Sequence, residues 1–412
     1  MQKDLQRRLR DLNLIPSEKQ TLLSNIAEQA ASMGLPCYLV GGFVRDLLLN
    51  EPVNDLDIIV EGDAIKLGEA LIQKYGGQLT SHTKFSTAIW HLPSTSNLQP
   101  STLDLITARS ETYEHAGALP IIKPSSIEDD LRRRDFTINA MAIRLDREHF
   151  GELLDPLGGQ KDLEQKLIRV LHPRSFIDDP TRIFRAIRYE QRYGFKIDST
   201  IEQDAMDVIK KLSGERIRHE LDLILEEKNS LQMILRAGNI GIFKCVHPKL
   251  PEFNQAYSDL LDTEPILDIP ISRITTGYML WFIDLPEDII LSIARRLDFT
   301  TDLTHTVWAA SLLKITLTFL ANSKPSEWAF ALEKLPLPSI YIVYLITREN
   351  ALLDYLSIWR HIKPHVTGED LKARGLPPGP RYKEILSNLR AAWLDGEIKN
   401  YEEEVELLST LL

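Results

Sequence analysis

The segment YLVGGFVRDLLLNEPVNDLDIIV, residues 38–60, holds glycines, an arginine and carboxylates in an order that suits phosphate chemistry. Gly41 and Gly42 lie between a strand-like run and a helix-like run, so their backbone N–H groups can approach a bound anion. Arg45, one turn into the helix, can reach the same phosphates with its forked guanidinium. The Walker pattern of Gly, four residues, Gly, Lys and Ser or Thr is missing.

Asp55 and Asp57 are separated by one residue on a predicted strand. This spacing points both side chains to one face, where their oxygens can share a hard cation such as Mg²⁺. Carboxylates beside a phosphate cradle are what metal-assisted phosphoryl or nucleotidyl transfer requires. Each signal alone has an ordinary alternative, which is a tight turn for the glycines and a helix cap or solvated pair for the aspartates. Their combination within residues 41–57 favours the functional interpretation.

Asp104 lies on a later apolar strand in TLDLITAR, residues 102–109. An unpaired carboxylate is costly to bury. Asp104 is therefore either a residue that faces water or a third carboxylate near the metal site, and the sequence leaves both alternatives open.

A cluster of arginines precedes an apolar run in DLRRRDFTINAMA, residues 130–142. The ordinary interpretation is a solvated basic helix end. An arginine cluster that enters a core segment is badly placed for solvation alone. We therefore favour a function in which Arg134 contacts a phosphate or ribose and Asp135 accepts a hydrogen bond from a sugar hydroxyl.

One side of a predicted helix in DDPTRIFRAIRYEQR, residues 178–192, gathers charged residues at every third position. They are Asp179, Arg182, Arg185 and Arg188. A separate apolar face can dock on a core. The like charges repel one another, and a polyanion such as RNA or a nucleotide would relieve that repulsion.

Asp179 and Arg182 can together distinguish nucleotide bases. The carboxylate accepts from the amino group of cytosine or adenine, and the arginine donates to ring or carbonyl acceptors. Uracil and guanine place a carbonyl against the carboxylate, and the unpaired groups can cost orders of magnitude in rate. Asp179 before Pro180 is equally a good helix N-cap, and one carboxylate can serve both purposes.

The elements that must position these residues alternate between strands and helices from about residue 36 to 145. CYLV, DLDIIV, STAIWHL and TLDLITAR predict strands, whereas FVRDLLL and DAIKLGEALIQKYG predict helices. Residues 1–30 predict one or two amphipathic helices that break near Pro16. After about residue 147 helical periodicity dominates, and clusters of proline and glycine divide the helical region.

Composition narrows the class of protein. A net charge of −11 over 412 residues argues against a nucleic-acid binder, although locally basic stretches can still hold RNA along one stripe. Cys37 and Cys245 form no CxxC pattern, so we expect neither a zinc site nor a disulfide framework. We expect the protein to lie in a reducing cytoplasm. No apolar run approaches the roughly 20 residues that span a bilayer. We therefore expect no membrane partner, and no obligate protein partner is evident.

The motifs LVGGFVRD, NDLDIIV, LRRRDFTINAMA, DDPTRIFRAIRYEQRYGF and ERIRHEL resemble, in order and spacing, those of class II tRNA nucleotidyltransferases. These are the CCA-adding enzymes and their bacterial poly(A) polymerase relatives in the polymerase β superfamily. The resemblance is strong over residues 36–225 and extends to the tail VTGEDLKARGLPPGPRYKEIL. It implies an α/β catalytic head with a polymerase β-like nucleotidyltransferase sheet, followed by an all-α neck, body and tail. The implied parts are an N-terminal helical extension (1–35), the head (36–146), a neck that recognises the base (147–229), a body (230–350) and a tail that binds tRNA (351–412).

The resemblance also implies a set of site residues. Asp55 and Asp57 would bind Mg²⁺, and Gly42 and Arg45 would contact the triphosphate. The full candidate set is catalytic Asp55, Asp57 and Asp104, with Gly41, Gly42, Arg45, Arg134, Asp135, Asp179, Arg182, Arg185 and Arg188 for the nucleotide. The implied activity is template-free addition of C and A to a tRNA 3′ end from CTP and ATP, with the acceptor and T arms of tRNA as partner. Glu215 and Arg216 would be structural.

Several alternatives stay open. They are an enzyme that adds only CC or only A, a poly(A) polymerase, and a non-catalytic RNA-binding protein. HTKFSTAIWHL stands where poly(A) polymerases usually carry a basic RRF-like block, which favours the tRNA enzymes, whereas Asp178 replaces the glutamate of many relatives. Segment 109–126 corresponds to the family's mobile switching loop. The histidines of HIKPH raise a metal-dependent phosphohydrolase, but the proline between them disfavours the helix that such ligands need.

Overall fold

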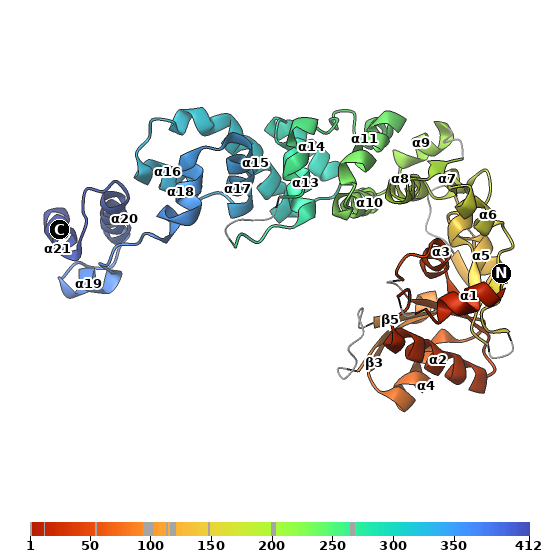
Figure 1. Cartoon of the computed structure of the whole chain (residues 1–412). Coiled ribbons are helices and arrows are strands. Elements are labelled where there is room, and N and C mark those ends of the chain that lie inside the picture. Colours follow the sequence, from red (N-terminus) through yellow and green to blue (C-terminus); the bar gives the residue numbers. More distant parts are fainter. Residues whose placement is uncertain are drawn as a thin grey trace. The chain divides into compact units, whose positions relative to one another are not determined.

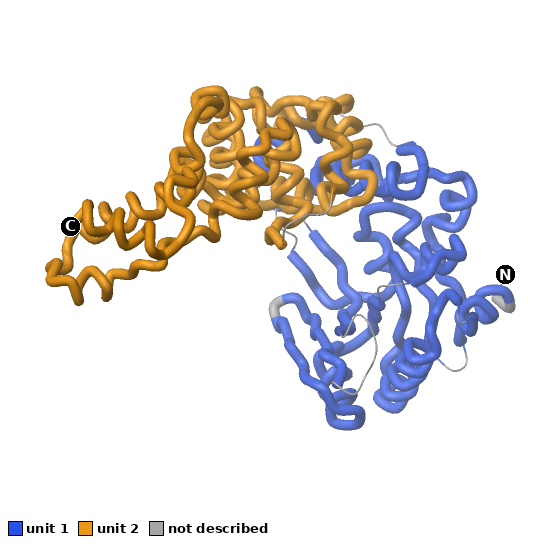
Figure 2. Tube along the Cα trace, turned by 60° about the vertical axis from the view of Figure 1, so that its left-hand side comes forward, with its two compact units in different colours: residues 1–212 blue, residues 213–412 orange. Residues whose placement is uncertain are grey.

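The chain was analysed as a computed structural model, which describes residues 2–11, 13–53, 56–93, 102–112, 114–115, 121–146, 149–198, 203–263 and 268–412. Figure 2 shows its two compact units, unit 1 (residues 1–212) and unit 2 (residues 213–412). Unit 1 contains the sheets, and the described part of unit 2 is helical (Figure 1). The predicted fold class is thus confirmed. The finer division into five parts stays a prediction, and the boundary between the units falls inside the predicted neck.

The main sheet of unit 1 has the strand order β3-β4-β5-β2-β1-β8-β9. Its strands are β1 (Cys37–Val40), β2 (Asp57–Val60), β3 (Gln78–His82), β4 (Thr87–His91), β5 (Thr102–Thr107), β8 (Ala142–Arg144) and β9 (Leu153–Leu154). Neighbouring strands pair antiparallel except β2 and β5, which pair in parallel. Two small sheets pair β6 (Arg109–Thr112) with β7 (Ile121–Pro124) and β10 (Leu167–Ile168) with β11 (Lys196–Ile197).

The described residues of unit 1 also form α-helices and 3₁₀ turns. They are α1 (Gln2–Leu9), α2 (Ser17–Ser32), α3 (Gly42–Leu49), α4 (Ala64–Tyr75), η1 (Thr83–Phe85), α5 (Ile127–Arg132), η2 (Thr137–Asn139), α6 (Gly159–Glu164), α7 (Ser175–Asp178), α8 (Thr181–Tyr193) and α9 (Gln203–Ile209). The strands and helices predicted between residues 36 and 109 are confirmed, as are the helices on either side of Pro16. Sequence periodicity missed β3 and the β6–β7 hairpin.

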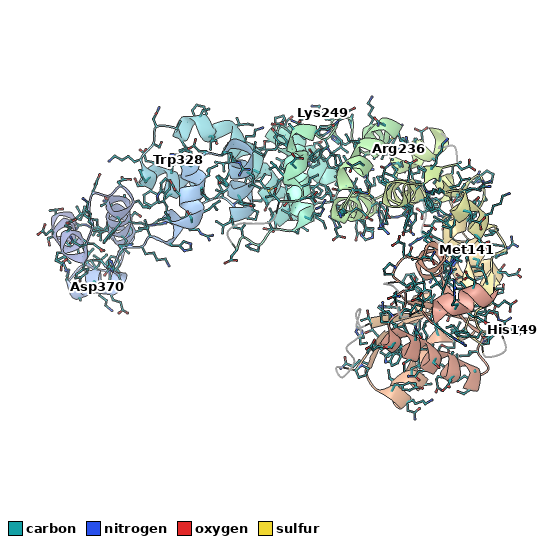
Figure 3. The ribbon with its side chains drawn as sticks, in the orientation of Figure 1. Met141, His149, Arg236, Lys249, Trp328 and Asp370 are labelled. Atoms are coloured by element: carbon teal, nitrogen blue, oxygen red, sulfur yellow. The ribbon has the colours of Figure 1, made fainter. Side chains whose placement is uncertain are left out.

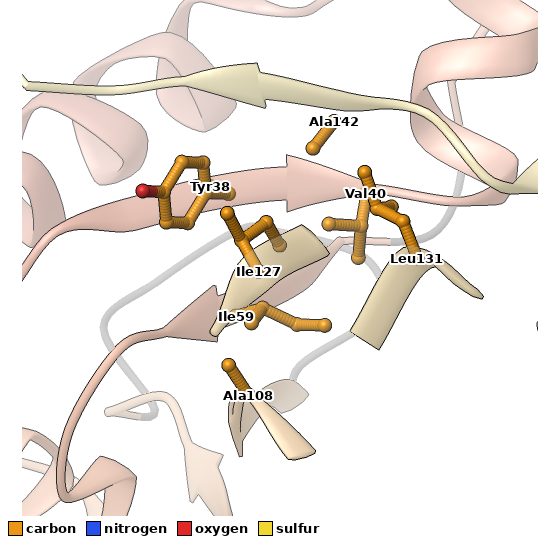
Figure 4. Packing of buried hydrophobic residues seen from close by; sticks show 7 residues of the cluster. All are labelled: Tyr38, Val40, Ile59, Ala108, Ile127, Leu131 and Ala142. Atoms are coloured by element: carbon orange, nitrogen blue, oxygen red, sulfur yellow. The ribbon is translucent and has the colours of Figure 1, made fainter. Parts of the chain in front are cut away.

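The two faces of the sheet are covered by different helices. Helix α4 packs on β3, β4 and β5, and it approaches so closely that a Cβ on Gly68 would lie 2.6 Å from Leu79. Helix α5 lies on the other face, where Ile127 and Leu131 join a cluster with Val40 and Ile59 (Figure 4). Because side chains alternate along a strand, the residues that share a face with this cluster point toward α5.

Unit 2 is built from helices and short 3₁₀ turns. They are α10 (Gly214–Glu226), α11 (Ser230–Ile240), α12 (Ile242–Val246), η4 (Gln255–Leu260), α13 (Arg273–Phe282), α14 (Glu287–Arg296), α15 (Thr301–Leu320), α16 (Pro325–Leu332), α17 (Leu337–Thr347), α18 (Asn350–Ser357), η5 (Trp359–His361), α19 (Gly368–Ala373), α20 (Pro380–Leu394) and α21 (Tyr401–Leu411). The side chains of this unit that Figure 3 labels include Trp328, which is buried on α16, and Asp370, which closes a capping box at the start of α19.

Helix α15 is, by length and composition, apolar enough to cross a membrane, with a mean hydropathy of 1.2 over its most apolar window. Asp302, His305, Lys314 and several threonines interrupt its apolar residues, so no continuous apolar run stands out in the sequence. In unit 2 this helix packs against α13, α14 and α17, and 33% of that window is buried. Its apolar residues are thus used, in part, as core.

Candidate active site

The ends of three adjacent strands bring the glycine turn and the carboxylates together. The register of β1 with β2, continued by one residue, places Val40 opposite Asp57, directly before Gly41. Strand β2 pairs in parallel with β5, with Asp57 opposite Asp104. Residues in register on neighbouring strands point to the same face. Asp57 and Asp104 therefore lie side by side, next to the turn that begins α3.

These carboxylates fit a divalent cation. Asp57 is half-buried and Asp104 is exposed, and carboxylate oxygens are the hard ligands that such a cation takes. The sequence left two alternatives for Asp104, a residue that faces water or a third carboxylate near the metal site. Asp104 is exposed to water and also lies beside Asp57, so its position is compatible with both. Asp55, the second predicted metal ligand, lies outside the described residues. Among the residues that are described, no group of three or more potential metal ligands is found.

The turn requires glycine for two reasons. Gly41 has a φ of +63°, which L side chains rarely adopt. A Cβ at Gly41 would also lie 2.7 Å from Nη1 of Arg134, and a Cβ at Gly42 would lie 3.4 Å from Nη2 of Arg45. Both predicted phosphate-binding arginines are thus held against the turn, at the positive end of α3.

Arg134 is held by a fully buried carboxylate. Asp130 accepts hydrogen bonds from Arg134 at 3.2 Å and from Arg133 at 2.7 Å. Arg134 also donates to the carbonyl of Asn139 at 3.4 Å. Only Arg132 of the cluster is exposed. The solvated interpretation therefore applies to Arg132, whereas the other two arginines have a structural partner.

Arg45 is 5% exposed and makes polar contacts on several sides. Its Nε donates to Asp46 at 2.8 Å and its Nη1 donates to Oδ1 of Asn139 at 2.7 Å. The guanidinium lies 4.8 Å from the ring centre of Tyr193 and 5.3 Å from that of Tyr189. Burial alone would lower the pKa of Arg45, but Asp46 and the tyrosines outweigh it and raise the pKa. Arg45 thus stays a fixed cation beside the glycine turn.

The arginines of helix α8 find partners inside unit 1, to which the helix belongs. Arg182, 6% exposed, donates to Oγ of Ser175 at 2.5 Å and to the carbonyl of Arg133 at 3.0 Å. Arg185 forms an ion pair with Asp135 at 2.7 Å. The repulsion expected among these like charges is therefore partly relieved inside the protein. Arg188 is half-buried on the same helix.

Asp135 is buried between several donors. Its Oδ2 accepts from Arg185, and its Oδ1 accepts from Nδ2 of Asn139 at 3.0 Å and from the backbone N–H of Phe136 at 2.8 Å. Burial alone would raise the pKa of Asp135, but Arg185 and Asn139 outweigh it and lower the pKa. The predicted ribose contact of Asp135 stays a prediction.

Asp179 makes the capping contact that the sequence offered as an alternative. Its Oδ1 accepts from the backbone N–H of Thr181 at 3.2 Å and from its hydroxyl at 2.7 Å, at the start of α8. Asp178, one residue earlier, ends α7 and lies 3.7 Å from Arg174. Base reading by Asp179 is a separate role that the capping contact does not test.

Sequence reasoning missed residues that connect the predicted ones. The missed residues are Asp46, Asp130, Asn139, Tyr189 and Tyr193. A signal existed for Asn139, because a lone amide inside the apolar segment FTINAMA must find partners when it is buried. Tyr189 and Tyr193 follow Arg185 at four-residue intervals, which places all three on one side of α8.

Comparison with known proteins agrees with this arrangement. Residues 37–169 match the family model of the poly A polymerase head domain. An A-adding tRNA nucleotidyltransferase from Halalkalibacterium halodurans is 30% identical, with 93% of this chain and 91% of that protein covered. The chain belongs to the class II tRNA nucleotidyltransferase family. The family resemblance inferred from the motifs is thus confirmed, and the members are enzymes.

Two further matches bear on this tRNA nucleotidyltransferase family member. An A-adding tRNA nucleotidyltransferase from Geobacter sulfurreducens is 34% identical over 95% of this chain, which spans only 47% of that longer protein. The Thermotoga maritima CCA-adding enzyme complexed with tRNA superposes with a TM-score of 0.71 at 29% identity, over 99% of this chain and 98% of that one. Proteins named CC-adding enzymes match as well.

Proposed function

We propose that this chain transfers AMP from ATP to the 3′ end of a tRNA that already ends in CC, with Mg²⁺ as its metal. The observation that carries nucleotidyl transfer is the placement of Asp57 and Asp104 in register beside the glycine turn. The choice of A addition is supported by two relatives named A-adding enzymes, each of which matches more than nine-tenths of this chain at 30% identity or more.

In the proposed reaction the terminal 3′-oxygen of the tRNA forms a bond to the α-phosphorus of ATP. The bond from that phosphorus to the bridging oxygen breaks, pyrophosphate leaves with the electron pair, and the hydroxyl proton passes to solvent. A divalent cation bound by Asp57 and Asp104, with Asp55 as a further predicted ligand, would stabilise the negative charge that develops. Arg134 and the N–H groups of the glycine turn would orient the phosphates.

Base selection is assigned to Asp179 and Arg182 at the start of α8. Adenine offers an amino group to the carboxylate and a ring nitrogen to the arginine. Arg182 donates to Ser175 and to the carbonyl of Arg133, and these bonds fix its guanidinium while three of its five N–H groups are left to donate to a base.

Complete CCA addition is the second candidate. Cytosine presents the same pattern of amino group and ring acceptor to Asp179 and Arg182. The likeness to the Thermotoga maritima CCA-adding enzyme extends over almost the whole chain. The pattern of bases that Asp179 and Arg182 can accept therefore allows both candidates.

One incorporation experiment separates these functions. Three tRNA transcripts, ending before CCA, in C and in CC, are each incubated with labelled CTP or labelled ATP and resolved on a denaturing gel. We expect one nucleotide to be added from ATP to the CC-ended transcript, and none from CTP. Stepwise addition of C, C and A to the shortest transcript would establish the second candidate, and long A tails would indicate a poly(A) polymerase. No Mg²⁺-dependent incorporation on any transcript would contradict nucleotidyl transfer altogether.

A further inference from the structure

Asn139 lies between the phosphate side and the base side of the candidate site. Its Oδ1 accepts from Nη1 of Arg45 at 2.7 Å, and its Nδ2 donates to Oδ1 of Asp135 at 3.0 Å. Asp135 in turn pairs with Arg185 on α8. Asn139 is 5% exposed, so both contacts are made away from water. The side chain thus joins two arginines that come from different helices.

The amide is suited to this position because it is neutral and has two different ends. An asparagine accepts with its oxygen and donates with its nitrogen at the same time. An aspartate at position 139 would satisfy Arg45 but would place a second carboxylate against Asp135. An alanine would leave the buried Arg45 without this acceptor, and leaving a buried charge short of a partner is costly.

Two further features hold the connection in place. Tyr189 accepts a hydrogen bond from Arg185 at 3.2 Å, and its ring lies beneath the guanidinium of Arg45. The turn η2 that carries Asn139 is fixed at its first residue, where Thr137 donates to Asp162 at 2.6 Å. Asn139 is therefore presented by a rigid turn, and the loop of contacts from Arg45 to Arg185 closes through Tyr189.

We propose that Asn139 is a positioning residue that sets Arg45 at the glycine turn and Asp135 against Arg185 together. ATP would then find its phosphate and base contacts already aligned, and disturbing Asn139 would weaken both. The inference rests on the proposed nucleotide site, since it assigns to Asn139 the alignment of that site.

The direction of the hydrogen bonds provides a sharp test. In Asn139→Asp two carboxylates oppose each other, and in Asp135→Asn the partner of Arg185 loses its charge. The double variant combines Asn139→Asp with Asp135→Asn. The new carboxylate at position 139 then accepts from Arg45 and from the new amide at position 135. The oxygen of that amide accepts from Arg185. The order of donors and acceptors from Arg45 to Arg185 is thereby restored with the same net charge, although the backbone N–H of Phe136 loses its acceptor on Oδ1 of residue 135.

The measurement is the Kd for ATP, determined by equilibrium dialysis with Mg²⁺ and without tRNA. We expect each single variant to bind ATP roughly tenfold to a hundredfold more weakly, the range of a lost hydrogen bond to a charged group. We expect the double variant to bind ATP more tightly than either single variant, with recovery held short of complete by the lost acceptor of the Phe136 N–H. Asn254→Asp is the matched control, since Asn254 also donates to a carboxylate, that of Asp284 at 3.5 Å in unit 2; its Kd should equal that of the unmodified chain.

The outcomes divide clearly. Unchanged ATP binding in Asn139→Asp overturns the proposal. So does a double variant that recovers the thermal unfolding midpoint but not the affinity, because Asn139 would then serve stability while Asp135 touches the nucleotide directly. A chain that binds ATP but transfers nothing to tRNA contradicts the proposed function only, and the affinities of the variants still decide the role of Asn139.

Discussion

The two units of the molecule differ in what they bury. Among the described residues, unit 1 buries several charged side chains and unit 2 buries only two. Those of unit 1 are Lys19, Arg45, Asp130, Asp135, Asp162, Arg182 and Glu190, and those of unit 2 are Glu220 and Glu404. Unit 2 instead packs aromatic rings, as where Tyr278 lies 4.7 Å from Phe299 between ring centres.

The unit that holds the candidate active site therefore buries charged side chains, whereas the helical unit is held together mainly by apolar packing. Removing charges from water costs several kcal/mol for each ion, which a partner repays only with good geometry. Unit 1 carries that cost around the glycine turn, where Asp130 and Asp135 fix arginines that face a nucleotide in the proposed function. Burial of apolar area is the cheaper way to hold helices together, and unit 2 relies on it.

The largest effect is expected from the carboxylates of the main sheet. We expect Asp57→Asn to lower nucleotide incorporation by about 10³-fold or more, because a metal ion contributes several kcal/mol of charge stabilisation. Asp104→Asn should lower it by roughly ten- to a hundredfold if Asp104 supports the metal from beside Asp57. The measurement is single-turnover incorporation of labelled AMP.

The matched control is Asp284→Asn in unit 2, where an exposed carboxylate pairs with Lys314. This variant should incorporate AMP at the normal rate. Full activity in Asp57→Asn would show that the catalytic site does not lie at this part of the sheet. The buried charges of unit 1 would then have no demonstrated link to catalysis. Full activity in Asp104→Asn alone would leave Asp57 as the centre and return Asp104 to the water-facing alternative.

The next effect concerns stability, and it compares two fully buried carboxylates. Asp130 faces two arginines, whereas Glu404 accepts from the neutral N–H groups of Val366 and Trp393. Asp130→Asn removes the ion-pair partner of Arg134, while Arg133 keeps Glu111 at 2.9 Å, and should cost about 3–5 kcal/mol. Glu404→Gln keeps one acceptor and should cost about 1–2 kcal/mol.

Chemical denaturation gives the two free energies of unfolding, and hydrogen exchange of peptides from each unit assigns them. Each variant should increase exchange mainly in its own unit. Equal costs for the two variants would show that charge pairing does not distinguish the units.

The sequence predicted those parts of the fold and site that depend on neighbours along the chain. Short runs rich in apolar and β-branched residues marked β1, β2, β4 and β5, and the three-residue spacing marked α8. The contact of Asp104 with Asp57 depends on the parallel register of β2 and β5, which no local pattern encodes. Asn139 contacts Arg45 from a distant segment and is linked to Arg185 through Asp135, so its role depends on tertiary structure.

A smaller effect is expected from alanine at two glycines with similar φ. Gly41 and Gly396 have φ of +63° and +70°, and a side chain at such a φ costs roughly 1–2 kcal/mol. The cost is higher at Gly41, because its ψ of −125° lies outside the left-handed helical region. Only at Gly41 would the new Cβ meet another residue, Arg134, whereas no atom lies within 4 Å of a Cβ at Gly396. Gly41→Ala should therefore weaken ATP binding as well as stability, and Gly396→Ala should lower stability alone.

Thermal unfolding and the Kd for ATP, measured on both variants, check this expectation. Unchanged ATP affinity in Gly41→Ala would show that the turn and Arg134 do not contact the phosphates. Weaker ATP binding in Gly396→Ala would show instead that a general loss of stability accounts for the effect.

The smallest effect is a pH dependence of opposite sign in the two units. The pKa of Asp135 in unit 1 is lowered from 3.8, since Arg185 and Asn139 outweigh its burial. The pKa of Asp222 in unit 2 is raised from 3.8 by burial, which the hydrogen bond from Tyr278 and the charge of Arg218 only partly offset. Asp135 therefore contributes stability that is present above pH 3.8 and is lost as the pH falls through its lowered pKa. Asp222 lowers the free energy of unfolding by an amount that is zero below pH 3.8 and grows as the pH rises toward its raised pKa.

Free energies of unfolding across this pH range, for the unmodified chain, Asp135→Asn and Asp222→Asn, separate the two contributions. The advantage of the unmodified chain over Asp135→Asn should shrink on acidification, because protonation removes the pairing that the variant already lacks. The advantage of Asp222→Asn over the unmodified chain should also shrink on acidification, because a protonated Asp222 no longer carries a desolvated charge. Acidification thus removes the stabilising contribution of Asp135 in unit 1 and the destabilising contribution of Asp222 in unit 2. If both carboxylates instead stabilised the chain as the pH rose, the buried charge of Asp222 would be stabilised by its partners, as that of Asp135 is. The two units would then not differ in how they treat a buried carboxylate.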